Sequence, residues 1–317
     1  MKKRVVTLLL TTLAVVSIIL PAFAAAPSET EFEPEFEPDP EVFVEDNAET
    51  VEETTILLDG EPVQSVEYEV VNGTCYVTVS SFVSLLDPEA MVEEEGGVVT
   101  VNAATVVEVV DAAEDGESVA NVVEETLSLT AWVDASYIVA NDRYLYAEDG
   151  LLLLNGSVAV PVRAMAKVFN LTVNYDSEAQ AILLNHQEGV GAYLTCGAWF
   201  YNNDTLYWLS RIINAECGNQ PLDGQLAVGN VIMNRLADPR FPDTIYEVLF
   251  QKNQFTPART GSIMKEPNDA SIIAAKLVMD GAQVVPTALF FNRAGQACYA
   301  SRTRDYVTTI GAHAFYN

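Results

Sequence analysis

Histidine and closely spaced cysteines are scarce in this chain of 317 residues. The sequence contains two histidines, His186 and His313, and four cysteines, none of them in a C-x-x-C pair. Structural and catalytic zinc sites take three or four Cys, His or acidic ligands, usually at short and regular spacings. Because no such spacing occurs, we predict no metal site and no cofactor.

Basic residues are nearly absent from the first half. Residues 27–150 hold 32 acidic residues and one basic residue, Arg143, whereas residues 151–317 hold 13 acidic and 12 basic residues. The first segment thus has a charge of −31 (1 − 32), against −29 for the whole chain. A field of this sign repels phosphate backbones, so we expect no nucleic acid partner.

Long apolar runs are missing beyond the N-terminus. The run from Val5 to Leu20 follows three basic residues and precedes Ala22-Phe-Ala24, which is the pattern of a secretory signal. The run is short of the ~20 residues that a membrane span needs, although an uncleaved anchor is the alternative. We therefore predict a signal peptide over residues 1–24, a secreted or cell-envelope (extracytoplasmic) protein, and no stable membrane insertion after cleavage.

The segment after the signal divides into a linker and a β-rich domain. Residues 25–55 are rich in Pro and Glu, a composition that favours a disordered spacer. Residues 56–188 contain alternating and β-branched apolar runs separated by Asp-Gly and Asn-Gly turns, which predict strands and hairpins. The stretch that starts at Asn72-Gly73 repeats from Asn155-Gly156, and each copy predicts a hairpin, a strand, a short helix and a strand.

The second copy of this repeat has a recognisable pattern. Val160-Pro-Val-Arg-Ala-Met165, followed by Leu171-Thr-Val-Asn-Tyr-Asp176, resembles the copper amine oxidase N-terminal-like domain found beside bacterial envelope enzymes. The resemblance implies a non-catalytic accessory domain and does not imply copper, because this stretch contains one histidine, His186. Two roles stay open for it: attachment to the cell wall, and plain spacing.

Helical periodicity begins after Tyr201, and residues 203–317 form the second predicted domain. Its first helix is expected to start at an Asn203 or Asp204 cap and to carry an apolar stripe that ends at Glu216. A carboxyl group in this position is partly desolvated, which raises its pKa and suits a general acid. The alternative is a surface Glu at a frayed helix end. Phe241-Pro242-Asp243 is expected to cap a third helix.

Several motifs of this half occur in the order seen in a known family. They are Ile213-Asn-Ala-Glu216, Gly224-Gln-Leu-Ala-Val-Gly-Asn-Val-Ile-Met-Asn-Arg235, Phe241-Pro242, Gln254-Phe255, Phe290-Phe-Asn292 and Ile310-Gly311-x-His313-x-Phe315-Tyr316. Together they resemble the SleB-type cell wall hydrolases. The resemblance implies a small lysozyme-like helical domain that cleaves peptidoglycan glycan strands, with Glu216 as the catalytic acid. The expected fold class is α+β: a β-rich, repeat-containing accessory domain and a mainly helical catalytic domain with a small β element.

The chain departs from the family just after this Glu. Many relatives have a second Glu at the position of Gln220, and the paired carboxyl groups of ordinary glycosidases would then have to include Asp223 or Asp243. Both of these have local structural explanations as helix-start residues. A lytic transglycosylase needs one carboxyl group, since the sugar supplies its own nucleophile, and this mechanism is our leading hypothesis. A hydrolytic muramidase is the alternative.

Further residues are candidates for binding the substrate. Gln254 is suited to hydrogen-bond an acetamido group or to cap a loop, and strand alternation lets only one of Phe290 and Phe291 face the cleft. His313 is either a structural or a catalytic histidine. The full set of predicted substrate-binding residues is Gln254, Phe255, Phe291, Asn292, His313 and Tyr316.

Cysteine placement allows one more prediction and one rival function. Cys217 and Cys298 lie in the catalytic half of an exported chain, and we predict a disulfide between them. The alternative is that Cys217 is buried as a small apolar residue. A free thiol near His313 would instead fit a cysteine peptidase, and a zinc amidase lacks its ligands here. The remaining alternative is a non-catalytic wall-binding protein.

Overall fold

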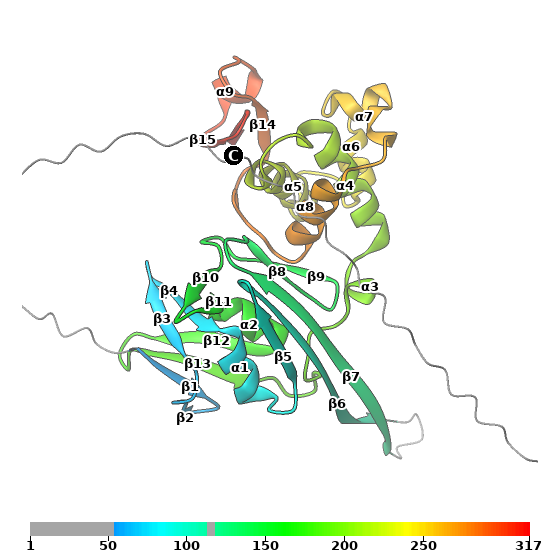
Figure 1. The fold of residues 1–317 in the computed structure, drawn as a ribbon. Helices are drawn as coiled ribbons and strands as arrows, with labels where there is room; N and C mark the ends of the chain where they lie inside the picture. Colours follow the sequence, from blue (N-terminus) through cyan, green and yellow to red (C-terminus); the bar gives the residue numbers. More distant parts are fainter. Residues whose placement is uncertain (1–53, 113–117) are drawn as a thin grey trace, which may run out of the picture. The chain divides into compact units, whose positions relative to one another are not determined.

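The computed structural model describes residues 54–112 and 118–317 (Figure 1). In it the two copies of the repeat fold as equivalent units. Each unit is a hairpin followed by a helix. The elements are β3 (Tyr68–Val71), β4 (Thr74–Thr78) and α1 (Val79–Leu86), and then β10 (Leu152–Leu154), β11 (Ser157–Pro161) and α2 (Val162–Val168). Asn72 and Asn155 adopt the left-handed region, with φ of 51° and 52°, as a tight Asn-Gly hairpin turn requires.

The two units pair with each other through β4 and β11. Val77 lies opposite Val160 in an antiparallel register, and these positions are equivalent in the repeat because 160 − 77 equals 155 − 72. The repeated units are therefore related by an approximate two-fold axis at the Val77–Val160 pair. The predicted internal repeat is confirmed.

The β-rich half contains three sheets. The first two have the strand orders β12-β13-β1-β2 and β10-β11-β4-β3, and the third has the order β5-β6-β7-β8-β9. The strands not yet given are β1 (Thr55–Leu58), β2 (Glu61–Pro62), β5 (Met91–Glu95), β6 (Val98–Ala112), β7 (Ser118–Trp132), β8 (Tyr137–Ala140), β9 (Arg143–Tyr146), β12 (Leu171–Asp176) and β13 (Ala181–His186). Phe82 of α1 and Phe169 after α2 meet in the shared core, with ring centroids 6.0 Å apart.

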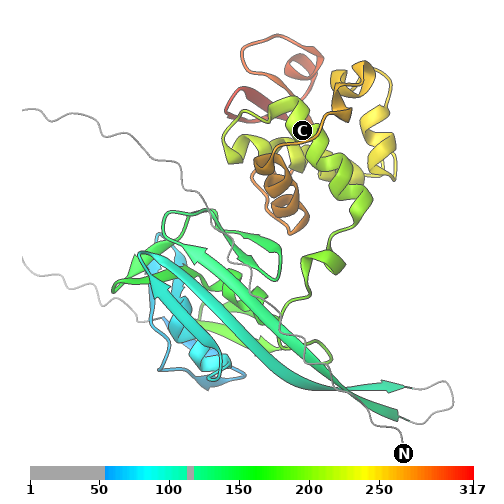
Figure 2. The same ribbon diagram turned by 45° about the vertical axis from the view of Figure 1, so that its right-hand side comes forward.

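The second half is mainly helical, which confirms the predicted α+β fold class (Figure 2). Its elements are α3 (Gly197–Phe200), α4 (Asn203–Cys217), α5 (Leu222–Ala237), α6 (Ile245–Phe250), α7 (Thr256–Thr260), a 3₁₀ turn (Ser262–Met264), α8 (Asp269–Met279), β14 (Phe290–Arg293), α9 (Tyr299–Thr303), β15 (Tyr306–Ile310) and β16 (His313–Tyr316). The three last strands form one sheet of order β14-β16-β15. The small β element is thus a three-stranded sheet.

Helix α4 carries the predicted apolar stripe. Asn202 caps it by accepting a hydrogen bond from the Thr205 backbone N–H, one residue earlier than expected. Leu209, Ile212 and Ile213 are fully buried in the helical core, where α4 packs against α8 and α5. The stripe therefore fixes the orientation of the last turn.

The cap of α6 differs from the predicted one. Thr244, and not Asp243, is the N-cap, because its Oγ1 accepts a hydrogen bond from the Glu247 N–H at 3.3 Å. The Glu247 carboxylate in turn accepts a hydrogen bond from the same hydroxyl at 2.8 Å. Asp243 is exposed just before this cap.

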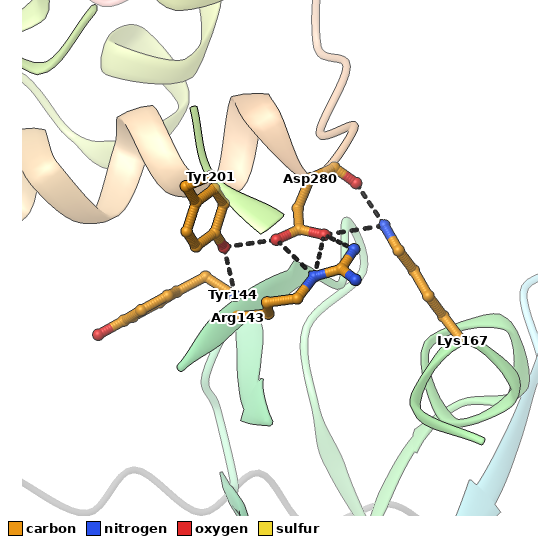
Figure 3. Close-up of polar contacts among 5 residues, drawn as sticks. All are labelled: Arg143, Tyr144, Lys167, Tyr201 and Asp280. Carbon is orange, nitrogen blue, oxygen red and sulfur yellow. Dashed lines mark hydrogen bonds and ion pairs between the residues drawn. The ribbon is translucent and has the colours of Figure 1, made fainter. Parts of the chain in front are cut away.

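A buried ionic cluster joins the two halves within the compact unit formed by residues 52–317 (Figure 3). Asp280, which caps the carboxyl end of α8, lies 2.5 Å from Arg143 of β9 and 3.1 Å from Lys167 of α2. The Tyr201 hydroxyl donates to Asp280 at 2.5 Å and accepts from the Tyr144 N–H at 3.0 Å. Residues 54–200 contain three basic residues, so two of the three are used in this contact.

Two predictions concern the N-terminal segment. The signal peptide (1–24) and nearly all of the linker (25–55) lie outside the described residues. In the part of the chain that the structure describes, no helix is both long enough and apolar enough to cross a membrane.

Candidate active site

A cleft of about 620 Å³ opens in the helical half, beside the small sheet. Its walls come from the end of α4, from α5, from the loop before α7, and from β14, α9 and β16. The lining residues are Glu216, Arg235, Gln254, Phe255, Thr256, Phe290, Phe291, Asn292, Arg293, Cys298, Tyr299, Ala300, Arg304 and His313. Most of the predicted site residues are therefore brought together, although they span nearly 100 positions of sequence, from Glu216 to His313.

Glu216 is the only carboxyl group in this lining. It occupies the last turn of α4, next to the fully buried Cys217, and desolvation by burial raises the pKa of its side chain. Within the described residues, its carboxyl group has no hydrogen bond or ion pair. A carboxyl group in this environment holds its proton to higher pH than an exposed glutamate does.

Arg235 of α5 sets the orientation of Gln254. The Arg235 side chain is buried, and it donates to the Leu289 carbonyl at 2.7 Å and to the Gln254 Oε1 at 3.1 Å. Burial lowers the pKa of Arg235 to about 10, which leaves it charged at neutral pH. Because the Gln254 oxygen is engaged, its amide N–H₂ group is left to donate into the cleft.

Both phenylalanines of β14 line the cleft, so the prediction that only one of them faces it is wrong. Phe290 packs against the Arg235 guanidinium and the Phe241 ring, while Phe291 packs on Phe255 with ring centroids 6.2 Å apart. β14 is an edge strand of its sheet, and side chains from consecutive positions of this strand, Phe290 and Phe291, both line the cleft. Alternation alone does not bury one face of such a strand.

Two polar atoms of the sheet wall are buried without a hydrogen-bond partner among the described residues. They are the Asn292 Oδ1 and the His313 Nδ1. The Asn292 amide is held by its N–H₂ group, which donates to the Gln296 carbonyl at 2.8 Å. Burial lowers the pKa of His313, whose ring meets Phe291 edge-on at 5.3 Å, so this histidine is neutral near pH 7. Unpaired buried acceptors and donors are the groups that a polar ligand satisfies.

Phe255 and Tyr316 lie in different environments. Phe255 is 6% exposed, borders the cleft and contacts Arg235, so it forms part of the apolar floor. Tyr316 is also buried, but it packs in a separate small cluster with Ala300 and Ala314 and does not line the cleft. A direct contact of Tyr316 with substrate has no support in this arrangement.

The predicted Cys217–Cys298 disulfide is not formed. Cys217 is buried in the helical core, and its Sγ lies 3.3 Å from the Ile213 carbonyl. Cys298 caps α9 instead, its Sγ accepting from the Ser301 N–H at 3.3 Å. Each sulfur thus has a local role, and the alternative reading of Cys217 as a small apolar core residue is the one that the structure supports. His313 lines the same cleft as Cys298.

The positions that could supply a second carboxyl group lie elsewhere. Asp223 is exposed and accepts a hydrogen bond from the Tyr146 hydroxyl at 3.1 Å, and neither it nor Asp243 lines the cleft. Gln220, which stands where many relatives have Glu, accepts from the Ala312 N–H at 3.0 Å and thereby holds the turn between β15 and β16. In the described residues, no group of three His, Cys, Asp or Glu is placed to hold a metal ion.

Sequence reasoning missed the cationic side of the cleft. Arg235, Arg293 and Arg304 all line it, and Arg304 lies 4.7 Å from the centre of the Phe290 ring. Arg235 closes the second family motif, so a basic residue on the apolar face of α5 was the available signal. Arg293 and Arg304 stand in no such pattern, and only the fold brings them into the same cleft as Glu216.

Comparison with known protein families identifies two matching segments. Residues 57–184 match the copper amine oxidase N-terminal domain, and residues 219–316 match the cell wall hydrolase family. The second match begins three positions after Glu216.

Individual relatives agree with the second match. The spore cortex-lytic enzyme of Oceanobacillus iheyensis is 32% identical over 116 residues, which is 36% of this chain and 42% of that enzyme. The spore cortex-lytic enzyme of Bacillus subtilis is 32% identical over 130 residues, 41% of this chain and 42% of that enzyme. The chain thus spans less than half the length of these relatives.

Among solved structures, the catalytic domain of the germination-specific lytic transglycosylase SleB from Bacillus anthracis is 26% identical. The superposition covers 39% of this chain and 100% of that catalytic domain, with a TM-score of 0.35. The chain is thus similar over residues 57–184 to the copper amine oxidase N-terminal domain, and over residues 219–316 to the cell wall hydrolase family.

Proposed function

We propose that this chain cleaves peptidoglycan glycan strands as a lytic transglycosylase, with Glu216 as its single catalytic acid and base. The observation that carries the proposal is that Glu216 is the one carboxyl group among the residues lining the cleft. A retaining or inverting hydrolase requires a second carboxyl group ~5 to 9.5 Å away. A lyase requires one, because the substrate itself provides the attacking oxygen.

In this mechanism the protonated Glu216 donates its proton to the oxygen that links N-acetylmuramic acid to N-acetylglucosamine. The C1–O bond breaks, and an oxocarbenium-like centre forms on the muramic sugar. The Glu216 carboxylate then takes the proton from the primary hydroxyl of the same sugar, whose oxygen bonds to C1 and closes a 1,6-anhydro ring. The raised pKa of Glu216 favours the protonated form that begins this cycle.

The other lining groups are suited to hold the substrate. The Gln254 amide N–H₂ can donate to an acetamido carbonyl, and the unpaired Asn292 Oδ1 can accept from an acetamido N–H or a hydroxyl. Phe291 offers an apolar surface beside them, and His313 contributes a neutral ring with an unpaired Nδ1. Each of these groups binds or orients, and none is needed as a second proton carrier.

Product analysis tests the proposal. Purified peptidoglycan is digested with the chain, and mass spectrometry is expected to find 1,6-anhydro-muramic ends. Reducing ends that carry an added water would contradict the lyase mechanism and indicate a muramidase, while free stem peptides would indicate an amidase. The absence of any product would favour a wall-binding protein.

A matched pair of variants tests the role of Glu216. Glu216→Gln keeps the shape of the side chain but cannot donate a proton, and turnover is expected to fall by about 10²- to 10⁴-fold. Glu266→Gln removes an exposed carboxylate that pairs with the buried Arg211 and does not line the cleft, and it serves as the control. Near-normal turnover by Glu216→Gln would remove this residue from the mechanism.

We propose further that the enzyme is exported and that the accessory domain keeps it at the wall. The support is the signal-like pattern of residues 1–24 and the accessory match at residues 57–184. The mature N-terminus is expected at Ala25. The inactive Glu216→Gln variant is expected to sediment with purified cell wall. A chain recovered with Met1 intact would contradict export with signal cleavage. A chain that stays in the supernatant would contradict attachment to the wall.

A further inference from the structure

An exposed aromatic cluster lies on the hydrolase domain beside the cleft. Tyr246 and Phe250, one turn apart on α6, stack on each other with centroids 4.3 Å apart and an interplanar angle of 22°. Trp208 of α4 meets both rings edge-on, at 5.4 and 5.5 Å, and Tyr207 meets Trp208 at 5.0 Å. We call these four residues the aromatic platform.

The platform is exposed where a helix normally presents polar groups. Ile245, Val248 and Leu249 turn the other face of α6 into the core, yet Tyr246 and Phe250 remain 48% and 37% exposed. Contiguous exposed apolar surface of this kind marks an interaction site more often than isolated exposed residues do. The packing of the domain therefore does not account for these rings.

A second hollow connects the platform with the cleft. This hollow, of about 510 Å³, shares Gln254, Phe255 and Thr256 with the cleft and reaches Phe250 of the platform. Its lining includes Gln251, whose Oε1 is buried without a partner among the described residues. An unpaired acceptor along this path suits a ligand that carries hydroxyl or amide donors.

The charge of the hollow also fits a sugar polymer that contains muramic acid. The lining contains two basic residues, Lys252 and Arg259, and no acidic residue. This contrasts with residues 27–150, where acidic side chains dominate. A strand with carboxylates is therefore attracted on this side of the hydrolase domain.

We propose that the aromatic platform is a distal subsite for the glycan strand, which runs from the cleft through the hollow and stacks a sugar ring on Tyr246 or Phe250. The inference rests on the proposed function, because the occupant is the continuation of the strand bound at Glu216. Sugar rings present C–H groups to the electron-rich face of an aromatic ring, and this contact needs no charge. The platform would then make the enzyme prefer long strands.

Binding to glycans of defined length tests this inference. The Glu216→Gln chain binds without cleaving, and its affinity is measured for alternating N-acetylglucosamine and N-acetylmuramic acid strands of four and about ten sugars. Adding Tyr246→Ala or Phe250→Ala is expected to weaken binding of the long strand by roughly threefold to tenfold per ring. Affinity for the four-sugar strand is expected to stay unchanged. Trp199→Ala, which removes a ring that is 86% exposed on α3, is the control.

The outcomes separate this inference from the proposed function. An equal loss of affinity for both strands, or no loss for either, would overturn the platform as a distal subsite. A chain that forms a dimer, which dissociates in Tyr246→Ala without a change in glycan affinity, would also overturn it. Failure of the parent chain to bind the long strand more tightly than the short one would also overturn it. Turnover is measured separately with the unmodified chain, so a length effect without cleavage would refute the proposed function alone.

Discussion

Removal of Arg143 tests whether the two halves of the described chain stabilise each other. Arg143 donates to the Asp280 carboxylate from Nε at 3.1 Å and from Nη2 at 2.5 Å, and the Asp280 side chain is 1% exposed. Arg143 also lies 3.4 Å over the ring of Phe200. Arg143→Ala therefore deletes the charge-assisted hydrogen bonds from Nε and Nη2 and one ring contact, and it leaves a buried carboxylate without its main partner.

The expected magnitude follows from what remains around Asp280. Loss of one partner from a buried ion pair costs about 3 to 5 kcal/mol. Lys167 still lies 3.1 Å from the same carboxylate oxygen, and the Tyr201 hydroxyl still donates to the other, so the lower end of this range applies. We expect a loss of about 3 kcal/mol, which lowers the Tm by roughly 6 to 12 °C for a unit of this size.

Differential scanning calorimetry and urea denaturation of the full chain measure this effect. Arg163→Ala is the matched control, because Arg163 is the third basic residue of residues 54–200 and is exposed, with an expected change within ~0.5 kcal/mol. The double variant Arg143→Met with Asp280→Leu removes both charges and is expected to recover part of the loss. A loss below about 1 kcal/mol, or a helical half that melts at an unchanged temperature, would refute the reasoning.

The remaining predictions concern the cleft. The pH profile of kcat/KM is expected to fall as pH rises through the elevated pKa of Glu216, since the acid must be protonated, and a profile that is flat up to pH 8 would contradict this. Glu216→Gln is expected to stabilise the fold above that pKa, because folding disfavours the charged carboxylate. It is expected to have no effect below the pKa of glutamate in the unfolded chain, ~4.3. Thermal melts at pH 4 and 8 measure the difference in stability. Gln254→Ala is expected to lower kcat/KM by about tenfold through a lost hydrogen bond, and a change in melting temperature instead would indicate a structural role. Iodoacetamide is expected to label Cys298 in the native chain and to spare Cys217, whose pKa burial and the neighbouring Glu216 raise to about 12; labelling of both, or of neither, in a peptide map would contradict this.

Much of the molecule follows from local features of the sequence. The Asn-Gly turn at Asn72 defines a hairpin by itself, because left-handed backbone is required there and the next residue is glycine. The apolar stripe of α4 likewise locates Glu216 at the end of a buried helix face. These features depend on residues within a turn or two of each other, so they could be predicted without knowledge of the fold.

Contacts between distant segments were decided by the tertiary structure. Arg143 and Asp280 are 137 positions apart, and neither lies in a pattern that marks it as half of an ion pair. Which atom of Gln254 faces the cleft depends on Arg235, 19 positions away on another helix. The predicted disulfide was wrong for the same reason: a cysteine pairs according to where its Sγ points, and the core around Ile213 and the cap of α9 hold the two sulfurs in separate local contacts. The sequence by itself therefore determined the helix that carries Glu216, the repeat and the candidate acid, while packing over long sequence separations determined the partners of each side chain.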